Sequence, residues 1–245
     1  MQDNAIIKPI KRKSLIQSDI AILVSAEPDI KSLIKVLDLQ NIQKKKLMMS
    51  SVYTGKTNNL SVLVTGPMIG APYATLILEE IIAAGIQTIL FLGWCGSLSE
   101  KVRIGDCIVP EASLIDEGTS RCYPGSSEQS EPDLAQADLI SKALKRNGHP
   151  SHKGKIWCTD GFYQETPEKI SNFQLKKAIG VEMETSALFT VAHYRKVSLA
   201  AVLIVSDELH QNKWLPGFSK KEFEKGRHSS FLAIQQWMTE RGESK

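Results

Sequence analysis

The chain has 245 residues, of which 42% are hydrophobic and 23% charged, and 30 Lys and Arg against 27 Asp and Glu leave a formal net charge of +3. This length suits one sizeable core, the apolar content excludes a disordered chain, and the near-neutral charge does not indicate a nucleic-acid partner. The four Cys, at 95, 107, 122 and 158, form no CxxC pair, which predicts free thiols and a cytoplasmic location.

The first 18 residues form a basic tail with Lys8, Lys11, Arg12 and Lys13, and no apolar segment follows that would make it a secretory signal. Residues 19–245 are expected to form a single domain. Two uncharged stretches, 57–78 and 81–99, are long enough to cross a bilayer. Because Gly and Pro interrupt the first and Gly and Gln the second, we expect buried elements joined by turns and no membrane span.

In chain order, the hydrophobic pattern predicts a strand at 20–24, a helix at 29–39, a strand at 60–64, a helix from Pro72 to just before Gly85, strands at 88–92 and 105–115, a helix at 133–146, a strand at 155–159, a helix at 182–194, a strand at 199–205 and a helix at 220–239. Apolar strands without alternation, separated by helices, indicate a mainly parallel sheet covered on both faces. Ligands bind beyond the carboxyl ends of such strands, so the segments that follow them are the places where a site is expected.

Three groups of residues in those segments together resemble one family. They are Gly66-Pro67-Met68-Ile69-Gly70, Gly93-Trp94-Cys95-Gly96 with Arg103-Ile104-Gly105-Asp106, and Val181-Glu182-Met183-Glu184 paired with Ser206-Asp207. The chain resembles the nucleoside phosphorylase and nucleosidase family, which includes purine nucleoside phosphorylases, uridine phosphorylases and methylthioadenosine nucleosidases. The resemblance implies an α/β fold of three layers (αβα) around a central mixed, mainly parallel sheet. It also implies a homo-oligomer between dimer and hexamer, a nucleoside substrate, and no cofactor or metal.

Cleavage of an N-ribosidic bond builds positive charge on the sugar and negative charge on the leaving base, so the site must protonate the base and hold the ribose hydroxyls. By the resemblance, Asp207 is the acid at purine N7, and Glu184 accepts hydrogen bonds from the 2′ and 3′ hydroxyls. The resemblance also assigns Phe162 to stacking on the base, and it places around the substrate Met68, Gly70, Gly93, Trp94, Glu182, Met183 and Ser206. Structural roles remain open for some of these residues, because Asp207 could cap a helix, Glu184 could be exposed on one, and Phe162 could belong to the core.

The sequence departs from the family where phosphate would bind. Phosphorylases of the family hold phosphate with arginines in Gly-Asp-Pro-x-Arg after the first strand and in Arg-x-Gly-Ser/Thr after the third. The corresponding segments here are Ala26-Glu27-Pro28-Asp29-Ile30 and Phe91-Leu92-Gly93-Trp94, and no Arg occurs between Arg12 and Arg103. Other basic residues would have to replace these arginines, and the candidates are Arg103, Arg121 or a lysine. Arg121 lies in a segment that resembles one found in uridine-type members of the family.

The nucleosidases of the family instead activate water with a Glu soon after the first strand. The resemblance aligns that base with Asp29, with Glu27 nearby, although a surface pair of carboxylates that begins a helix is equally open. Three functions of a purine-type nucleoside site therefore remain. They are phosphorolysis with inorganic phosphate as co-substrate, hydrolysis of the methylthioadenosine/adenosylhomocysteine type, and nucleoside binding without catalysis, which Phe91 and Trp94 in the acceptor position would favour.

Overall fold

The computed structural model describes residues 5–10, 18–57, 60–125, 127–211 and 213–242. Its elements, in chain order, are β1 (Ile20–Val24), α1 (Glu27–Val36), β2 (Gln40–Leu47), β3 (Ser50–Thr57), β4 (Leu60–Gly66), α2 (Ala71–Ala83), β5 (Thr88–Ser97), β6 (Cys107–Asp116), η1 (Ser120–Cys122), β7 (Gln129–Ser130), α3 (Leu134–Arg146), β8 (Ser151–Thr159), η2 (Phe162–Gln164), α4 (Pro167–Leu175), β9 (Ala178–Glu182), α5 (Thr185–Arg195), β10 (Ser198–Glu208), β11 (Leu215–Pro216) and α6 (Lys221–Gly242). In the basic tail, Lys8 is described, and Lys11, Arg12 and Lys13 lie outside the described residues.

One sheet joins the described strands, and its centre is parallel. β1 pairs in parallel with β4 and β5, and β10 continues the parallel order beside β5. β6, β8 and β9 are parallel to one another, while β6 is antiparallel to β10 and β9 is antiparallel to β5. These pairings close β10, β6, β8, β9 and β5 into a ring, so the carboxyl ends of β5, β9 and β10 meet.

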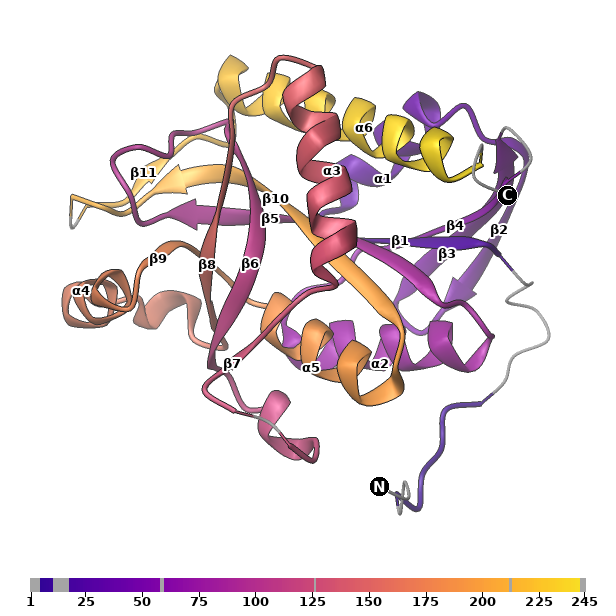
Figure 1. Ribbon diagram of the computed structural model, residues 1–245, viewed down its shortest axis with the longest axis horizontal. Helices are drawn as coiled ribbons and strands as arrows, with labels where there is room; N and C mark the ends of the chain where they lie inside the picture. The colour runs from indigo at the N-terminus through magenta and orange to yellow at the C-terminus, as the bar shows by residue number, and fades with distance from the viewer. Residues whose placement is uncertain (1–4, 11–17, 58–59, 126, 212, 243–245) are drawn as a thin grey trace.

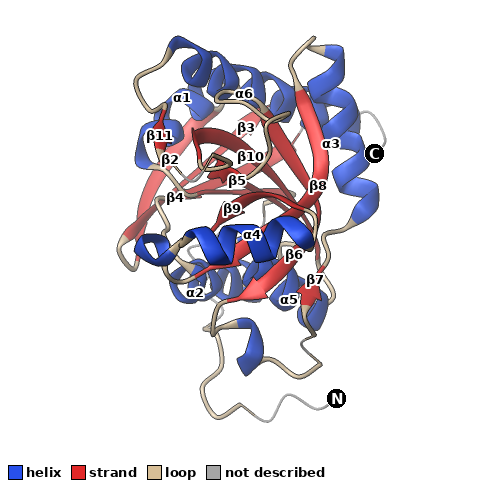
Figure 2. Cartoon of the chain, turned by 90° about the vertical axis from the view of Figure 1, so that its left-hand side faces the viewer, coloured by secondary structure: helices blue, strands red, loops and turns tan. Residues whose placement is uncertain are grey.

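Helices cover both faces of the sheet: α1, α3 and α6 lie on one side, and α2 and α5 on the other (Figures 1 and 2). The sequence of β1 does not alternate between apolar and polar residues because both faces of the strand are covered. Ile20, Ile22 and Val24 pack toward the first layer of helices, and Ala21 and Leu23 pack toward the second. The expected α/β class with a central mixed sheet is confirmed. No helix in the described ranges has both the length and the apolar content needed to span a bilayer.

Several elements differ from the sequence-based expectation. The hairpin of β2 and β3 was not predicted, because β2 is an edge strand whose lysines face solvent and hide any apolar pattern. The helix predicted at 182–194 begins three residues later, at Thr185, and residues 178–182 form β9. The strands predicted at 88–92 and 199–205 extend to Ser97 and Glu208, so the candidate residues that follow them are held in sheet positions.

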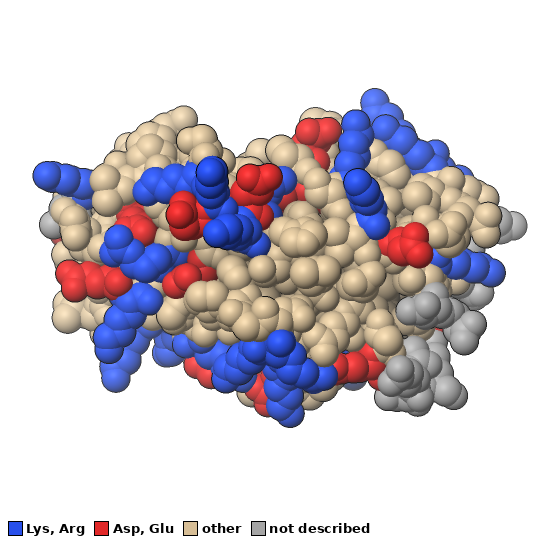
Figure 3. Space-filling view, turned by 90° about the horizontal axis from the view of Figure 1, so that it is seen from above, with Lys and Arg blue, Asp and Glu red and all other residues tan. Residues whose placement is uncertain are grey.

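The outer surface mixes both signs of charge. On the face seen from above, Lys and Arg side chains are interspersed with Asp and Glu side chains among uncharged residues (Figure 3). This face therefore presents no continuous surface of one sign.

Candidate active site

A pocket of about 280 Å³ opens where the carboxyl ends of β5, β9 and β10 meet. Its volume is close to the lower end of small-molecule sites, about 300 Å³. Four carboxyl groups line it, those of Glu165, Glu182, Glu184 and Asp207, and none of the described lining residues is Lys, Arg or His. Aromatic rings complete the wall: Trp94, Phe162 and Phe218. The pocket therefore combines flat apolar surface with several acids and no basic side chain.

Asp207 projects from the end of β10, where it is 5% exposed. The Ser206 hydroxyl donates to its Oδ1 at 2.6 Å, and the indole N–H of Trp214 donates to its Oδ2 at 3.0 Å. Burial raises the pKa of Asp207 above its ordinary value, although both hydrogen bonds act in the opposite direction. The side chain is thus held in one orientation, in surroundings that favour a proton on it.

Glu182 holds the turn between β9 and α5. Its Oε2 accepts the backbone N–H groups of Glu184 and Thr185, both at 2.8 Å, and its Oε1 accepts the Thr185 hydroxyl at 2.6 Å. These bonds satisfy N–H groups that the first turn of α5 leaves without partners, which explains why the helix begins only at Thr185. The carboxylate of Glu182 consequently fixes the backbone from which Met183 and Glu184 enter the pocket.

Glu184 is buried beside Glu182, and its Oε1 accepts the backbone N–H of Gly70 at 2.6 Å. Burial and the neighbouring Glu182 carboxylate raise the pKa of Glu184 to about 8, and the Gly70 bond offsets part of that rise. Gly70 has a φ of +82°, a conformation that other residues rarely adopt, so glycine is needed where the loop turns toward Glu184. Met68, which begins this loop, is 1% exposed and packs in the core, so it does not line the pocket.

Trp94 forms the wall nearest α1 and α6. Its indole N–H donates to Asp29 Oδ2 at 2.6 Å, and Arg227 Nε pairs with Asp29 Oδ1 at 2.5 Å. The Arg227 guanidinium also lies 5.8 Å from the Trp94 ring centroid. Gly93 precedes Trp94 within β5 and does not line the pocket, and a Cβ there would come within 2.7 Å of the Phe91 ring. The ring of Trp94 is therefore fixed by an ion pair that stays outside the pocket.

The two carboxylates expected to activate water do not face the pocket. Asp29 is fully buried with both oxygens engaged by Trp94 and Arg227, because α1 points it toward α6. Burial raises its pKa, while Arg227 and Trp94 lower it. Glu27, in the first turn of α1, is outside the pocket lining as well. Neither side chain lines the pocket, and their expected role in activating water stays a prediction.

The arginines considered as phosphate ligands also lie elsewhere. Arg121 is exposed on η1 and is absent from the pocket lining. Arg103 is exposed and pairs with the buried Glu208, Nε to Oε1, at 3.3 Å. In the described chain, these side chains do not supply positive charge to the pocket.

Four residues of the site escaped the sequence-based reasoning. Glu165 follows Phe162 by three positions, so a slightly longer search beyond the predicted strand 155–159 would have included it. Trp214 and Phe218 lie in an irregular segment with no periodicity to mark them. Arg227 sits on the predicted C-terminal helix, 198 positions from its partner Asp29, and no local pattern reveals such a contact.

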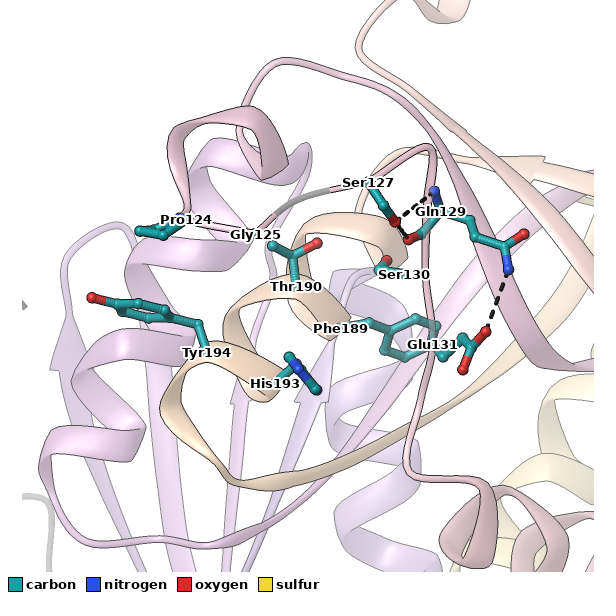
Figure 4. Close-up of a pocket in the computed structure, with 10 residues that line it drawn as sticks. All are labelled: Pro124, Gly125, Ser127, Gln129, Ser130, Glu131, Phe189, Thr190, His193 and Tyr194. Atoms are coloured by element: carbon teal, nitrogen blue, oxygen red, sulfur yellow. Dashed lines mark hydrogen bonds between the residues drawn. The ribbon is translucent and has the colours of Figure 1, made fainter. Parts of the chain in front are cut away.

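A second hollow of about 280 Å³ lies along α5, where Thr190, His193 and Tyr194 face the segment around Ser127 and Ser130 (Figure 4). Its single carboxylate, Glu131, accepts a hydrogen bond from Gln129 at 3.3 Å. Among the residues described, no group of three His, Cys, Asp or Glu side chains is arranged to hold a metal ion. The converging acids at the strand ends make the first pocket the candidate site.

Comparison with known proteins is consistent with this geometry. Residues 19–233 match the family model described as the Phosphorylase superfamily. A guanosine phosphorylase from Halorubrum lacusprofundi is 29% identical over 151 residues, which cover 62% of this chain and 62% of that protein. The chain thus spans less than two thirds of that relative's length.

Two solved structures share the fold. Purine nucleoside phosphorylase from Toxoplasma gondii, in complex with immucillin-H, has a TM-score of 0.83 and 18% identity and covers 100% of both chains. The 5'-methylthioadenosine/S-adenosylhomocysteine nucleosidase from Helicobacter pylori has a TM-score of 0.76 and 22% identity and covers 91% of this chain and 99% of that one. At such identities the likeness concerns the fold alone.

Proposed function

The chain belongs to the Phosphorylase superfamily, and on that premise we propose that it cleaves the N-glycosidic bond of a purine-type nucleoside. The observation that carries the proposal is the pocket at the strand ends, in which a buried Asp207, a buried Glu184 and the ring of Phe162 line one cavity. A nucleoside has a flat base, a ribose with a diol, and a glycosidic bond that joins the base to the sugar. Phe162 complements the flat base, Glu184 the diol, and Asp207 the base edge that must be protonated. The names of the similar proteins, two phosphorylases and a nucleosidase, support the same class of reaction.

In this proposal Asp207 is the acid at the base. Burial raises the pKa of its carboxyl, which favours the protonated form that an acid needs, and the Ser206 and Trp214 bonds fix the orientation of the carboxyl group. Protonation of purine N7 removes the negative charge that would otherwise build on the leaving base. The acid therefore acts where the transition state differs most from the substrate.

Glu184 is proposed to hold the ribose hydroxyls. Only one of its oxygens is engaged by Gly70, and the side chain lines the pocket beside Met183. As the bond to the base breaks, positive charge develops on the sugar, and a nearby carboxylate stabilises it. Ionisation of Glu184, which burial opposes in the empty pocket, becomes favourable as that charge develops.

We propose water as the acceptor of the ribosyl group: the bond between C1′ and the base breaks as Asp207 gives its proton to the base, the water oxygen bonds to C1′, and the proton that this water loses returns through solvent to Asp207. A phosphate dianion requires fixed positive charge and N–H donors, and the described lining offers four carboxyl groups and no Lys, Arg or His. Arg227 forms an ion pair with Asp29 and so is not available to phosphate. We assign Asp29 to positioning Trp94 rather than to activating water. Phosphorolysis, the reaction named for two of the similar proteins, is the alternative outcome of the test.

The experiment is a screen of adenosine, inosine, guanosine, uridine and methylthioadenosine, with products identified in phosphate and in phosphate-free buffer. Free base together with free ribose in both buffers supports the proposal. Ribose 1-phosphate that forms only with phosphate would replace water by phosphate as acceptor. Nucleoside binding without any cleavage, unchanged in Asp207→Asn, would indicate a non-catalytic binding protein and would refute the enzymatic proposal.

The setting of the reaction is also proposed. The step needs no organic cofactor or metal, since protonation of the base and stabilisation of the sugar are both assigned to side chains of this chain. We place it in nucleoside metabolism in the cytoplasm, with the protein acting as a homo-oligomer, and size-exclusion chromatography with light scattering would test the assembly.

A further inference from the structure

Trp214 lies beside the acid, on a segment that is tied to the acid's own strand. β11 pairs antiparallel with the end of β10, with Pro216 opposite Asp207, and the Gly217 N–H donates to the Ser206 carbonyl oxygen at 2.8 Å. This pairing holds Trp214 where its indole N–H donates to Asp207 Oδ2 at 3.0 Å, although the residue is 56% exposed. The contact is therefore set by the backbone and not by burial of the ring.

The two oxygens of the Asp207 carboxyl group have different neighbours. Oδ1 lies 2.6 Å from the hydroxyl of Ser206, which lines the cavity. Oδ2 accepts the indole N–H of Trp214, which is outside the cavity lining. A hydroxyl can donate or accept a hydrogen bond, whereas an indole N–H only donates. Oδ2 is thus fixed as an acceptor, and the place that remains for an acidic proton is Oδ1.

The Ser206 hydroxyl can adapt to a proton on Oδ1. It has one hydrogen and two acceptors within reach, Asp207 Oδ1 at 2.6 Å and the Cys95 carbonyl oxygen at 3.2 Å. While Oδ1 carries the proton, the hydroxyl accepts from Oδ1 and donates to Cys95. Once the proton has moved to a base, the hydroxyl donates to Oδ1 instead, so each oxygen of the new carboxylate is held by a donor.

We propose that Trp214 is a positioning residue for the reaction, which confines the proton of Asp207 to Oδ1 and stabilises the carboxylate that forms as this proton passes to the base. The inference rests on the proposed function, because it takes Asp207 to be the acid. In the step, the Oδ1–H bond breaks as N7 takes the proton, the bond between C1′ and the base leaves its electron pair on the base, and Trp214 keeps its hydrogen. The indole bond strengthens as negative charge develops on the carboxyl group, so it stabilises the transition state more than the bound substrate.

The test compares the pH profile of kcat/KM, for a nucleoside that the wild type cleaves, in the wild type and in Trp214→Phe, which keeps an aromatic ring without the N–H. Because the acid works only while protonated, kcat/KM falls above the pKa of Asp207, and the Trp214 bond lowers that pKa. Loss of the bond should move this alkaline limb up by about one pH unit, while the plateau below it falls by about 3- to 10-fold because the acid is weaker. A substitution that only loosens the fold would lower the plateau without moving the limb.

Other titratable groups face Asp207, and their titration must be separated from that of the acid. Glu165 beyond η2 and the Cys95 thiol on β5 sense its charge, and Glu182 and Glu184 line the same cavity. Burial raises the pKa of Glu165 to about 7. The profile is therefore repeated in Glu165→Gln, where the upward shift caused by Trp214→Phe should persist.

Trp157→Phe is the matched control. The Trp157 indole N–H also donates to a carboxylate, Asp116 Oδ2 at 3.0 Å, and neither residue lines the cavity, so the same substitution there should leave the plateau and the limb in place. A limb that stays put in Trp214→Phe, or that moves equally in Trp157→Phe, would overturn the inference while leaving the proposed reaction intact.

Failure of the proposed function would give a different result, because no nucleoside would then be cleaved. Carbon-13 NMR titration of the Asp207 carboxyl group, assigned with the spectrum of Asp207→Asn, still tests Trp214 in that case. A higher Asp207 pKa in Trp214→Phe than in the wild type supports the inference, and the same pKa in both proteins refutes it.

Discussion

Replacing Glu184 by Gln should make the protein more stable at alkaline pH while removing a group from its active site. Burial and the neighbouring Glu182 carboxylate raise the pKa of Glu184 in the folded protein to about 8, whereas in the unfolded chain it has its ordinary value of 4.5. Between these values the folded state binds more protons, so the free energy of unfolding falls as the pH rises. At about 1.4 kcal/mol per pH unit, this range sets an upper limit of about 5 kcal/mol for the loss.

The amide introduced by Glu184→Gln carries no charge at any pH and can still accept the Gly70 N–H bond. We therefore expect the free energy of unfolding of this variant to match that of the wild type at pH 5 and to exceed it at pH 8.5, by no more than about 5 kcal/mol. Urea denaturation at half-unit pH steps measures the difference, and Glu168→Gln, the same change at an exposed position, should stay within about 0.5 kcal/mol throughout. Parallel stability curves for the wild type and Glu184→Gln would refute the argument that burial and Glu182 hold a proton on Glu184.

Two further substitutions separate catalysis from structure. Asp207→Asn keeps the Trp214 contact possible but removes the acid, so kcat/KM should fall by about 10²- to 10⁴-fold with little change in melting temperature, whereas unchanged base release would remove Asp207 from the mechanism. Asp29→Asn leaves the Arg227 guanidinium without its carboxylate, so the free energy of unfolding should fall by about 3 kcal/mol or more. That variant should retain activity in conditions where it stays folded, because the amide oxygen can still accept the Trp94 N–H. A folded variant that binds nucleoside with the affinity of the wild type but cleaves it about 10²-fold more slowly would instead identify Asp29 as the base that activates water.

Much of the fold follows from local hydrophobic pattern. β1 was predicted with the observed bounds because all five of its residues are apolar and both faces of the strand are covered. β2 could not be predicted, since five of its eight residues are Gln or Lys and its stability comes from pairing with β3. The late start of α5 depends on Glu182, whose side chain takes over the N–H groups that a continuing helix would bind, and helical periodicity does not show this.

Some residues of the candidate site could be predicted from the sequence, and others could not. Asp207, Glu184 and Phe162 were predicted to belong to a site, through their resemblance to family motifs and their place after strands, and the structure puts them around one cavity. The resemblance aligned Asp29 with the base that activates water, and a surface pair of carboxylates was equally open. Sequence register gives the place of Asp29 along the chain but could not reveal its ion pair with Arg227 on α6. Glu165 and Trp214 belong to irregular segments, and only the three-dimensional path of the chain brings them beside Asp207.

The most direct test of the central claim is product identification from a purine nucleoside incubated with the purified protein in phosphate-free buffer. The account predicts that free purine and free ribose appear in equal amounts, and that added phosphate neither speeds the reaction nor yields ribose 1-phosphate. A reaction that stops without phosphate would contradict the proposal that water is the acceptor. Nucleoside that remains intact in both buffers would contradict the proposal that the protein is an enzyme.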